Sequence, residues 1–140
     1  MDNNIIKEIL NEADKSLDSL DIPVGAVIVK DNVIIGKGHN DRILNNNVLG
    51  HAEINAIKEA IKTLGDYRLN GCDLYVTLEP CNMCMEICKE ARIDNIYFLL
   101  KKDNMNSYKK TNKCTIENFN EEKTIYADKL SAFFKDNLNR

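Results

Sequence analysis

The sequence contains no long apolar run, and this absence argues against a membrane-spanning protein. A membrane-spanning helix needs about 20 consecutive apolar residues, whereas charged residues make up 29% of this chain. The first residues, M-D-N-N-I-I-K-E, also lack the basic segment and following apolar segment that mark a secretory signal. We therefore expect a cytoplasmic protein with no membrane partner.

The sequence also lacks an even set of cysteines and a strong charge of either sign. It has five cysteines, and disulfides between them are improbable in a reducing compartment. Metal binding or simple burial is then the better interpretation. The net charge of -3 gives the whole protein no attraction for nucleic acid, although a local basic patch remains compatible with it.

Internal repeats and an interdomain linker are missing as well, and the only low-complexity tract is a short run of asparagines. A chain of 140 residues has the size of one domain and is long enough to bury a core. We therefore expect residues 1–140 to form a single domain.

Periodicity of the apolar residues predicts alternating helices and strands. The expected elements are a helix over 3–20, a hairpin over 24–38, a loop over 39–50, a helix over 51–64, a strand over 73–78, a helix over 81–91, a strand over 96–100, an exposed loop over 101–113 and a helix over 121–138. The order strand, helix, strand over residues 73–100 implies a parallel unit with a right-handed crossover. The fold class is therefore α/β, with three layers.

Two cysteines, Cys81 and Cys84, lie three positions apart in the stretch L-E-P-C-N-M-C. A redox pair would occupy such a place, because a helix N-terminus lowers the pKa of a thiol. Reduced cysteines are also often buried in a core. The spacing is equally compatible with half of a metal site, so these alternatives stay open when the pair is considered alone.

A histidine at the start of another helix favours the metal. His51 opens one predicted helix and Cys81 and Cys84 open another, so all three can meet at one sheet edge. Three such ligands leave the fourth tetrahedral position of zinc to water, which is typical of catalytic zinc. Glu53 follows two residues later and either complements the helix dipole or exchanges protons with that water.

These residues also carry a resemblance to a known family. H-A-E (51–53) and P-C-N-M-C (80–84) resemble the H-x-E and P-C-x-x-C signature of zinc-dependent nucleoside and nucleobase deaminases. Further stretches are similar to bacterial tRNA adenosine deaminases, in the order D-I-P-V-G-A-V-I-V (21–29), G-H-N (38–40), H-A-E-I-N-A-I (51–57), D-Y-R-L (66–69), L-Y-V-T-L-E-P-C-N-M-C (74–84) and A-R-I (91–93). The resemblance covers roughly residues 5–100, and more weakly 127–134.

The resemblance implies a cytidine-deaminase-like fold, three-layer α/β/α with a central mixed sheet, and a homodimer. It assigns His51, Cys81 and Cys84 to one Zn²⁺ per subunit and Glu53 to proton transfer. It also implies that Asn40 hydrogen-bonds the substrate nucleoside. The predicted walls of the substrate pocket are Ile22, Pro23, Val24, Gly25, Ala26, Ala52, Leu78, Glu79 and Pro80.

The segment after the last similar stretch departs from the tRNA-specific branch. That branch continues with a glycine-rich D-x-K-x-G-type loop, whereas this chain reads L-L-K-K-D-N-M-N-S-Y-K-K. Lysines and a tyrosine are the candidates to contact RNA there, although a solvated loop explains them as well. The candidate nucleic-acid contacts are Lys101, Lys102, Tyr108, Lys109, Lys110 and Lys113, with Phe134 beside the substrate strand.

The remaining histidine and cysteines receive structural interpretations. Cys88 lies one helical turn beyond Cys84, and we expect it in the core rather than on the metal. Cys72 and Cys114 have no partner spacing and are expected to pack, while His39 is expected to face solvent.

The function expected from the resemblance is hydrolytic deamination of adenosine to inosine in tRNA, at the wobble position of the anticodon loop. One rival is a deaminase of free guanine, cytosine or a nucleoside, and another acts on single-stranded DNA. A third is a noncatalytic binding module stabilised by zinc. Glu53 argues against this last alternative, because structural zinc sites usually close the fourth position with a protein ligand.

Overall fold

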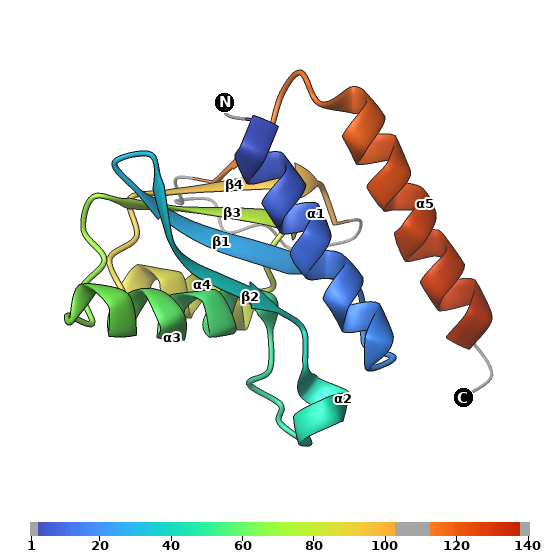
Figure 1. The fold of residues 1–140 in the computed structure, drawn as a ribbon, viewed down its shortest axis with the longest axis horizontal. Coiled ribbons are helices and arrows are strands. Elements are labelled where there is room, and N and C mark those ends of the chain that lie inside the picture. Colours follow the sequence, from blue (N-terminus) through green and yellow to red (C-terminus); the bar gives the residue numbers. More distant parts are fainter. Residues whose placement is uncertain (1–2, 103–112, 138–140) are drawn as a thin grey trace.

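The computed structural model describes residues 3–102 and 113–137 and arranges them as helices around one sheet (Figure 1). The elements, in chain order, are α1 (Asn3–Asp18), β1 (Gly25–Lys30), β2 (Val33–His39), α2 (Arg42–Asn45), α3 (Ala52–Leu64), β3 (Cys72–Leu78), α4 (Asn82–Glu90), β4 (Asn95–Leu100), β5 (Lys113–Thr115) and α5 (Asn120–Asn137). Of the helices in these two ranges, none is both long enough and apolar enough to cross a bilayer.

The sheet is mixed, as expected. Its strand order is β2-β1-β3-β4-β5, with β1 antiparallel to both of its neighbours and β3, β4 and β5 parallel to one another. Helices α3 and α4 lie on one side of the sheet, and α1 and α5 lie on the other (Figure 1). The predicted three-layer fold and the parallel strand-helix-strand unit over residues 73–100 are therefore confirmed.

Both faces of the sheet bury apolar side chains, which follows from the alternation of side chains along a strand. On β1, Ala26 and Ile28 pack with α3 and α4, whereas Val27 and Val29 pack with α1 and α5. The turn between β1 and β2 places Asp31 and Asn32 at φ of 50° and 65°, as a tight hairpin turn requires. The predicted hairpin is confirmed.

Two short elements lie where the sequence predicts only loops. Helix α2 forms because the buried carboxylate of Asp21 accepts hydrogen bonds from the Arg42 side chain and the Ile43 backbone N–H. Strand β5 forms by pairing with the edge of β4. Cys114, in β5, is exposed, so the expectation that it packs is wrong, whereas Cys72 is buried as expected.

The last helix has the predicted bounds to within one residue, and Tyr126 is its buried side chain. Ile125 and Phe134 are 45% and 49% exposed, whereas Tyr126 is fully buried. The Tyr126 hydroxyl donates a 2.6 Å hydrogen bond to the Pro23 carbonyl oxygen. This bond ties α5 to the segment that leads into β1.

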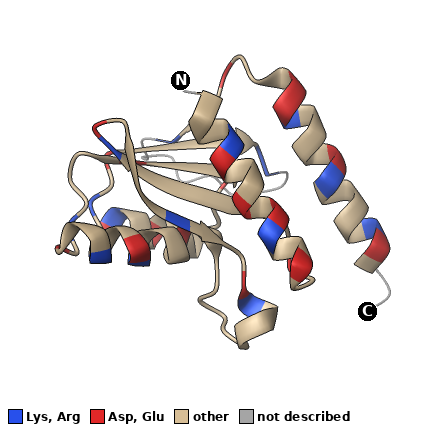
Figure 2. Cartoon of the chain, viewed as in Figure 1, with Lys and Arg blue, Asp and Glu red and all other residues tan. Residues whose placement is uncertain are grey.

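The surface charges are mixed. Figure 2 shows acidic and basic residues interspersed along α1, α3 and α5, in keeping with the small net charge of -3. Ion pairs such as Lys37–Glu8 and Lys129–Asp14 connect neighbouring elements at the surface.

Two glycines in β2 allow α3 to approach the sheet closely. A Cβ atom at Gly38 would lie 2.3 Å from the Ala52 carbonyl oxygen, and one at Gly36 would lie 2.3 Å from that of Ala56. Real Cβ atoms never come so near a backbone oxygen, so a larger residue would push the helix away. The close packing of α3 on β2 therefore requires glycine at positions 36 and 38.

We predict that Gly38→Ala lowers the free energy of unfolding by roughly 1–3 kcal/mol or more, because overpacking displaces α3. Gly36→Ala is expected to do the same. Urea unfolding measures both effects. Lys37→Ala, between them, is the control and loses only a surface ion pair worth up to about 1 kcal/mol. Equal stability of Gly38→Ala and Lys37→Ala would contradict this account.

Candidate active site

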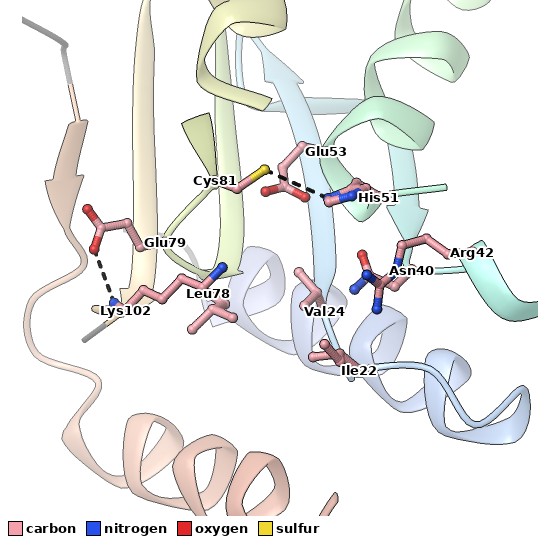
Figure 3. A pocket seen from close by; sticks show the side chains of 10 residues that line it. All are labelled: Ile22, Val24, Asn40, Arg42, His51, Glu53, Leu78, Glu79, Cys81 and Lys102. Atoms are coloured by element: carbon pink, nitrogen blue, oxygen red, sulfur yellow. Dashed lines mark hydrogen bonds between the residues drawn. The ribbon is translucent and has the colours of Figure 1, made fainter. Parts of the chain in front are cut away.

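Two helices begin at the same place, and each has a metal-binding residue type at its N-cap. His51 occupies the N-cap position of α3, and Cys81 occupies that of α4. Both residues have extended backbone, and neither side chain makes a capping hydrogen bond. Cys81 Sγ and His51 Nδ1 lie 4.0 Å apart (Figure 3). The positive ends of the two helix dipoles therefore meet where thiolates or a metal-bound anion would be stabilised.

The third predicted ligand lies with the other two. One ligand atom from each of His51, Cys81 and Cys84 falls within 4.8 Å of the others. Tetrahedral zinc with ordinary bond lengths places N and S ligands roughly 3.5–3.8 Å apart. The donor set and its spacing therefore fit zinc with only a small contraction, and the cysteines are free thiols rather than a disulfide.

The two thiols differ in their electrostatics. Hydrogen bonds from Cys84 and His51 lower the pKa of Cys81 to about 3, although burial opposes them. The hydrogen bond to Cys81 and burial raise the pKa of Cys84. The pKa of His51 is raised because its ring is hydrogen-bonded to Cys81. Cys81 is thus ready to bind a metal, whereas Cys84 would release its proton when a metal displaces it.

Glu53 lies in the first turn of α3, beside this cluster. Its side chain is buried, with the residue only 4% exposed. Burial raises the pKa of Glu53 to about 7, with the nearby Cys81 adding to the effect and the charges of His51 and Lys102 opposing it. A carboxyl group in this place can both accept and release a proton near neutral pH.

A small cavity of about 80 Å³ opens beside Glu53. It is formed by α2, α3 and the ends of β1, β2, β3 and β4 (Figure 3). Its lining consists of Ile22, Val24, Asn40, Arg42, His51, Glu53, Leu78, Glu79, Cys81 and Lys102. All of these except Arg42 are residues that the sequence nominates.

The other predicted wall residues lie behind this lining. Ala26 and Ala52 are fully buried in the core, and Pro80 is buried beside Cys81. Gly25 faces α1, because a Cβ atom there would meet the Ile9 carbonyl oxygen. Pro23 presents its carbonyl oxygen to Tyr126. These five residues therefore support the cavity without lining it.

Asn40 has a structural contact that the sequence did not reveal. Its Oδ1 accepts a 2.8 Å hydrogen bond from the Ala52 N–H, one of the free donors at the start of α3. Asn40 thus caps α3 in place of His51, which leaves the imidazole for the ligand cluster. The Asn40 side chain also lines the cavity (Figure 3).

Arg42 is the lining residue that the sequence reading missed. Its guanidinium binds the fully buried carboxylate of Asp21 at 2.7 Å. Burial by itself raises the pKa of Asp21, but hydrogen bonds from Arg42, Ile43 and Ile22 outweigh it, and the net effect lowers the pKa. The sequence signal that could have pointed to Arg42 is Asp21, because an aspartate that becomes buried requires a cationic partner.

The candidate nucleic-acid contacts are divided by the structure. Lys101 and Lys102 are exposed, and Lys102 lines the cavity. The prediction that Lys113 contacts phosphate is wrong, because its side chain is only 7% exposed and its ammonium pairs with the Glu79 carboxylate at 2.5 Å. Tyr108, Lys109 and Lys110 lie outside the described residues.

Phe134 lines an apolar groove next to the cavity. That groove shares Ile22 and Arg42 with the cavity, and Phe133 contacts the Phe134 ring edge-on. The position is compatible with the predicted place of Phe134 beside a substrate strand.

Cys88 and His39 complete the set of predicted residues. Cys88 is buried in the core, as expected, and burial raises the pKa of its thiol to about 12. His39 faces solvent only in part, because its side chain is 31% exposed and its Nδ1 lies 3.1 Å from the Glu12 carboxylate on α1.

The family model for the cytidine and deoxycytidylate deaminase zinc-binding region matches residues 1–100. The chain belongs to this family, and the family description together with the His, Cys, Cys group supports zinc as its metal. A tRNA-specific adenosine deaminase from Streptococcus pyogenes serotype M18 is 47% identical over 93 residues, which are 66% of this chain and 58% of that protein. The match thus spans little more than half the length of such curated relatives.

Solved structures agree with the fold. A structure from studies of A-to-I editing by tRNA:A34 deaminases superposes with a TM-score of 0.80 and 29% identity, over 89% of this chain and 99% of that one. A guanine deaminase from Bacillus subtilis gives a TM-score of 0.67 and 26% identity, over 94% and 95% of the two chains.

We predict that Cys84→Ala abolishes zinc retention after dialysis, because two ligands are left, while Cys88→Ala retains it. The zinc-to-protein ratio, measured by atomic absorption, decides. The two cysteines lie on one helix and are both buried, so Cys88→Ala is a matched control. Zinc lost from Cys88→Ala but kept by Cys84→Ala would contradict the ligand assignment.

A second prediction concerns Asp21. Because its pKa is lowered in the folded state, its carboxylate stabilises the fold above the unfolded pKa of about 3.9, and this contribution disappears as the pH falls through the folded pKa. Asp21→Asn should therefore lower the free energy of unfolding by roughly 1–3 kcal/mol near neutral pH. The difference from wild type should shrink at about pH 3.

Urea unfolding of both proteins measures this difference, with a chelator present at each pH so that metal release does not contribute. Asp14→Asn is the control, because its ion pair with Lys129 lies at the surface. A penalty for Asp21→Asn that stays constant down to about pH 3 would refute the Arg42 pairing as its cause.

Proposed function

We propose that this protein is a zinc-dependent hydrolase that converts adenosine to inosine in tRNA, at the anticodon wobble position. The observation that carries the proposal is the buried carboxylate of Glu53, which lies in one small cavity with His51 and Cys81. Relatives named tRNA-specific adenosine deaminase, at 42–48% identity, support adenosine in tRNA as the substrate. The similar structure from work on tRNA:A34 deaminases supports the wobble position.

In this proposal His51, Cys81 and Cys84 hold one zinc ion per subunit. Three protein ligands are typical of catalytic zinc. When bound, zinc lowers the pKa of a water molecule towards about 7 and so supplies a nucleophile near neutral pH. The buried Glu53 is not among the three ligand residues, which leaves its carboxyl group for proton transfer.

Glu53 moves two protons during the reaction. Its carboxylate accepts a proton from the attacking water and gives it to N1 of the purine as the water oxygen bonds to C6. A second proton then passes through Glu53 to the amino group, which leaves C6 as ammonia. Adenosine and water are thereby converted to inosine and ammonia.

The cavity lining supplies the other roles. The Asn40 amide hydrogen-bonds the nucleoside, and its anchoring on the Ala52 N–H fixes its orientation. Ile22, Val24 and Leu78 present apolar surface to the base and exclude water from its faces (Figure 3). Pro23, Gly25, Ala26, Ala52 and Pro80 form the supporting layer of the pocket.

Access to the base favours a single-stranded substrate. A base in an anticodon loop is unpaired, so turning it into a pocket costs less than from a duplex. Lys101, Lys102 and Phe134 are the described residues proposed to contact the RNA. Tyr108, Lys109 and Lys110 remain part of the prediction from sequence.

We further propose that residues 1–140 act as one deaminase domain, that two copies form a homodimer and that the protein works on tRNA in the cytoplasm. Exposed apolar side chains around α2 support self-association. They are Ile43, Leu44, Val48 and Leu49, with exposed fractions from 49% to 77%.

The nearest rival is deamination of a free base, which the likeness to a guanine deaminase favours. Incubating the zinc-loaded protein with tRNA, single-stranded DNA and free bases, and then quantifying inosine, uracil and xanthine, separates the alternatives. Inosine formed only in tRNA supports the proposal. Xanthine or uracil in its place would replace it with the rival.

We predict that Glu53→Gln keeps its zinc but forms inosine about 10²- to 10⁴-fold more slowly, because the amide cannot carry the proton. Single-turnover kinetics on tRNA and the zinc-to-protein ratio measure the two properties. Glu59→Gln, on the exposed side of the same helix, is the matched control. A Glu53→Gln enzyme that keeps full activity would exclude the proton-transfer role and revive the noncatalytic zinc module.

A further inference from the structure

Glu79 joins two parts of the chain at the rim of the cavity. It follows β3 directly, is only 3% exposed and lines the cavity. Its Oε1 accepts the Lys102 backbone N–H at 3.1 Å, and its Oε2 pairs with Lys113 Nζ at 2.5 Å. One carboxylate therefore binds both the chain that leaves β4 and the first residue of β5.

Lys113 neutralises a charge that would otherwise oppose an anionic substrate. The cavity lining contains two carboxylates, Glu53 and Glu79. The Lys113 side chain is 7% exposed and the Glu79 side chain that it faces is 2% exposed, and the Lys113 ammonium also lies 6.0 Å from the centre of the Phe98 ring. A buried carboxylate without such a partner would be strongly unfavourable, so the pair acts as one neutral unit.

The pairing leaves another cation available. Within residues 3–102 and 113–137, the Lys102 ammonium has no hydrogen bond or ion pair, although its side chain lines the cavity. The other cationic lining residue with a permanent charge, Arg42, is held by Asp21. Figure 3 shows Lys102 and Arg42 on opposite sides of the cavity. Without Lys113, the Glu79 carboxylate would carry an unbalanced negative charge beside Lys102, whose backbone N–H it already accepts.

We propose that Glu79 and Lys113 form a positioning pair that keeps the Lys102 ammonium free at the cavity mouth, where it binds the phosphate ester next to the target nucleoside. The inference rests on the proposed function, because it assumes that a nucleoside occupies the cavity. Within that function it assigns Lys102 a contact to the RNA phosphodiester. A free nucleotide carries the same phosphate chemistry, and the experiment separates the two sources.

The first test is the salt dependence of binding. The probe is a fluorescein-labelled single-stranded RNA with one adenosine, and its affinity for the zinc-loaded protein is measured by anisotropy over a range of salt concentrations. Lys102→Met should weaken binding several-fold at low salt and reduce the slope of log K against log salt by about 0.7, the value for one phosphate on a single strand. Lys89→Met removes the same charge from an exposed position on α4 and should change neither.

The second test addresses the pair. Lys113→Met should reduce the salt slope as much as Lys102→Met does, although Lys113 is not among the residues that line the cavity. Lys113→Arg should retain the wild-type slope. Glu79→Gln combined with Lys113→Met should restore it, because the amide oxygen still accepts the Lys102 N–H but no anion attracts the ammonium. If Lys113 only stabilised the fold, the double variant would not recover the wild-type salt slope.

Zinc content and the urea midpoint are recorded for every variant. If Lys113→Met does not fold, Lys102→Met and the double variant still decide. The inference is overturned if Lys102→Met binds the RNA with the wild-type slope, or if folded Lys113→Met does. It is also overturned if Lys102→Met weakens binding of adenosine 5′-monophosphate but not of RNA, since the phosphate is then that of a free nucleotide.

The binding test needs no turnover, so its failure differs from that of the proposed function. Inosine formed by wild type together with an unchanged Lys102→Met slope rejects the inference and leaves the function in place. A reduced slope without inosine from any tRNA rejects the function and leaves the phosphate contact in place.

Discussion

The structure depends on the meeting of two helix N-termini at one end of the sheet. N-cap positions normally hold residues whose side chains satisfy the free N–H groups of the first turn. Here His51 and Cys81 occupy the caps of α3 and α4 without doing so. Asn40 takes over part of the task for α3 from another element. The helices thus give up local capping, and what they gain is a cluster of ligand atoms in a positive electrostatic environment.

The cluster of ligand atoms requires α3 to pack closely against the sheet. The ligand atoms lie within 4.8 Å of one another only if α3 is pressed against β2, and Gly36 and Gly38 make this contact possible. The opposite layer contributes through the bond from Tyr126 to Pro23. Asp21 and Arg42 fix the chain between them, so the cavity is bordered by residues that are anchored in three different parts of the fold.

Features with local causes were predictable from the sequence. The periodicity of α1 and α3, the hairpin turn and the ligand motifs each lie within a short window, and nine of the ten lining residues were nominated in advance. The features that the sequence did not predict depend instead on contacts between distant residues. Helix α2 depends on Asp21, β5 on the edge of β4, and the burial of Lys113 on Glu79. In each case the partner is distant in sequence, and residue type alone does not specify it. His39 and Tyr126 follow the same rule, because Glu12 and Pro23 determine their environments.

Glu79 has a consequence for how this fold tolerates change. Because its carboxylate binds Lys102 on one side and Lys113 on the other, the two ends of the intervening segment are fixed by the rim rather than by that segment's own length. The free-energy cost of closing a loop, which comes from lost chain entropy, rises slowly with loop length, by about 0.6 kcal/mol for each doubling. A change in the number of residues between them is therefore expected to leave the cluster of His51, Cys81 and Cys84 in place. Such a junction separates the length of that connection from the geometry of the site.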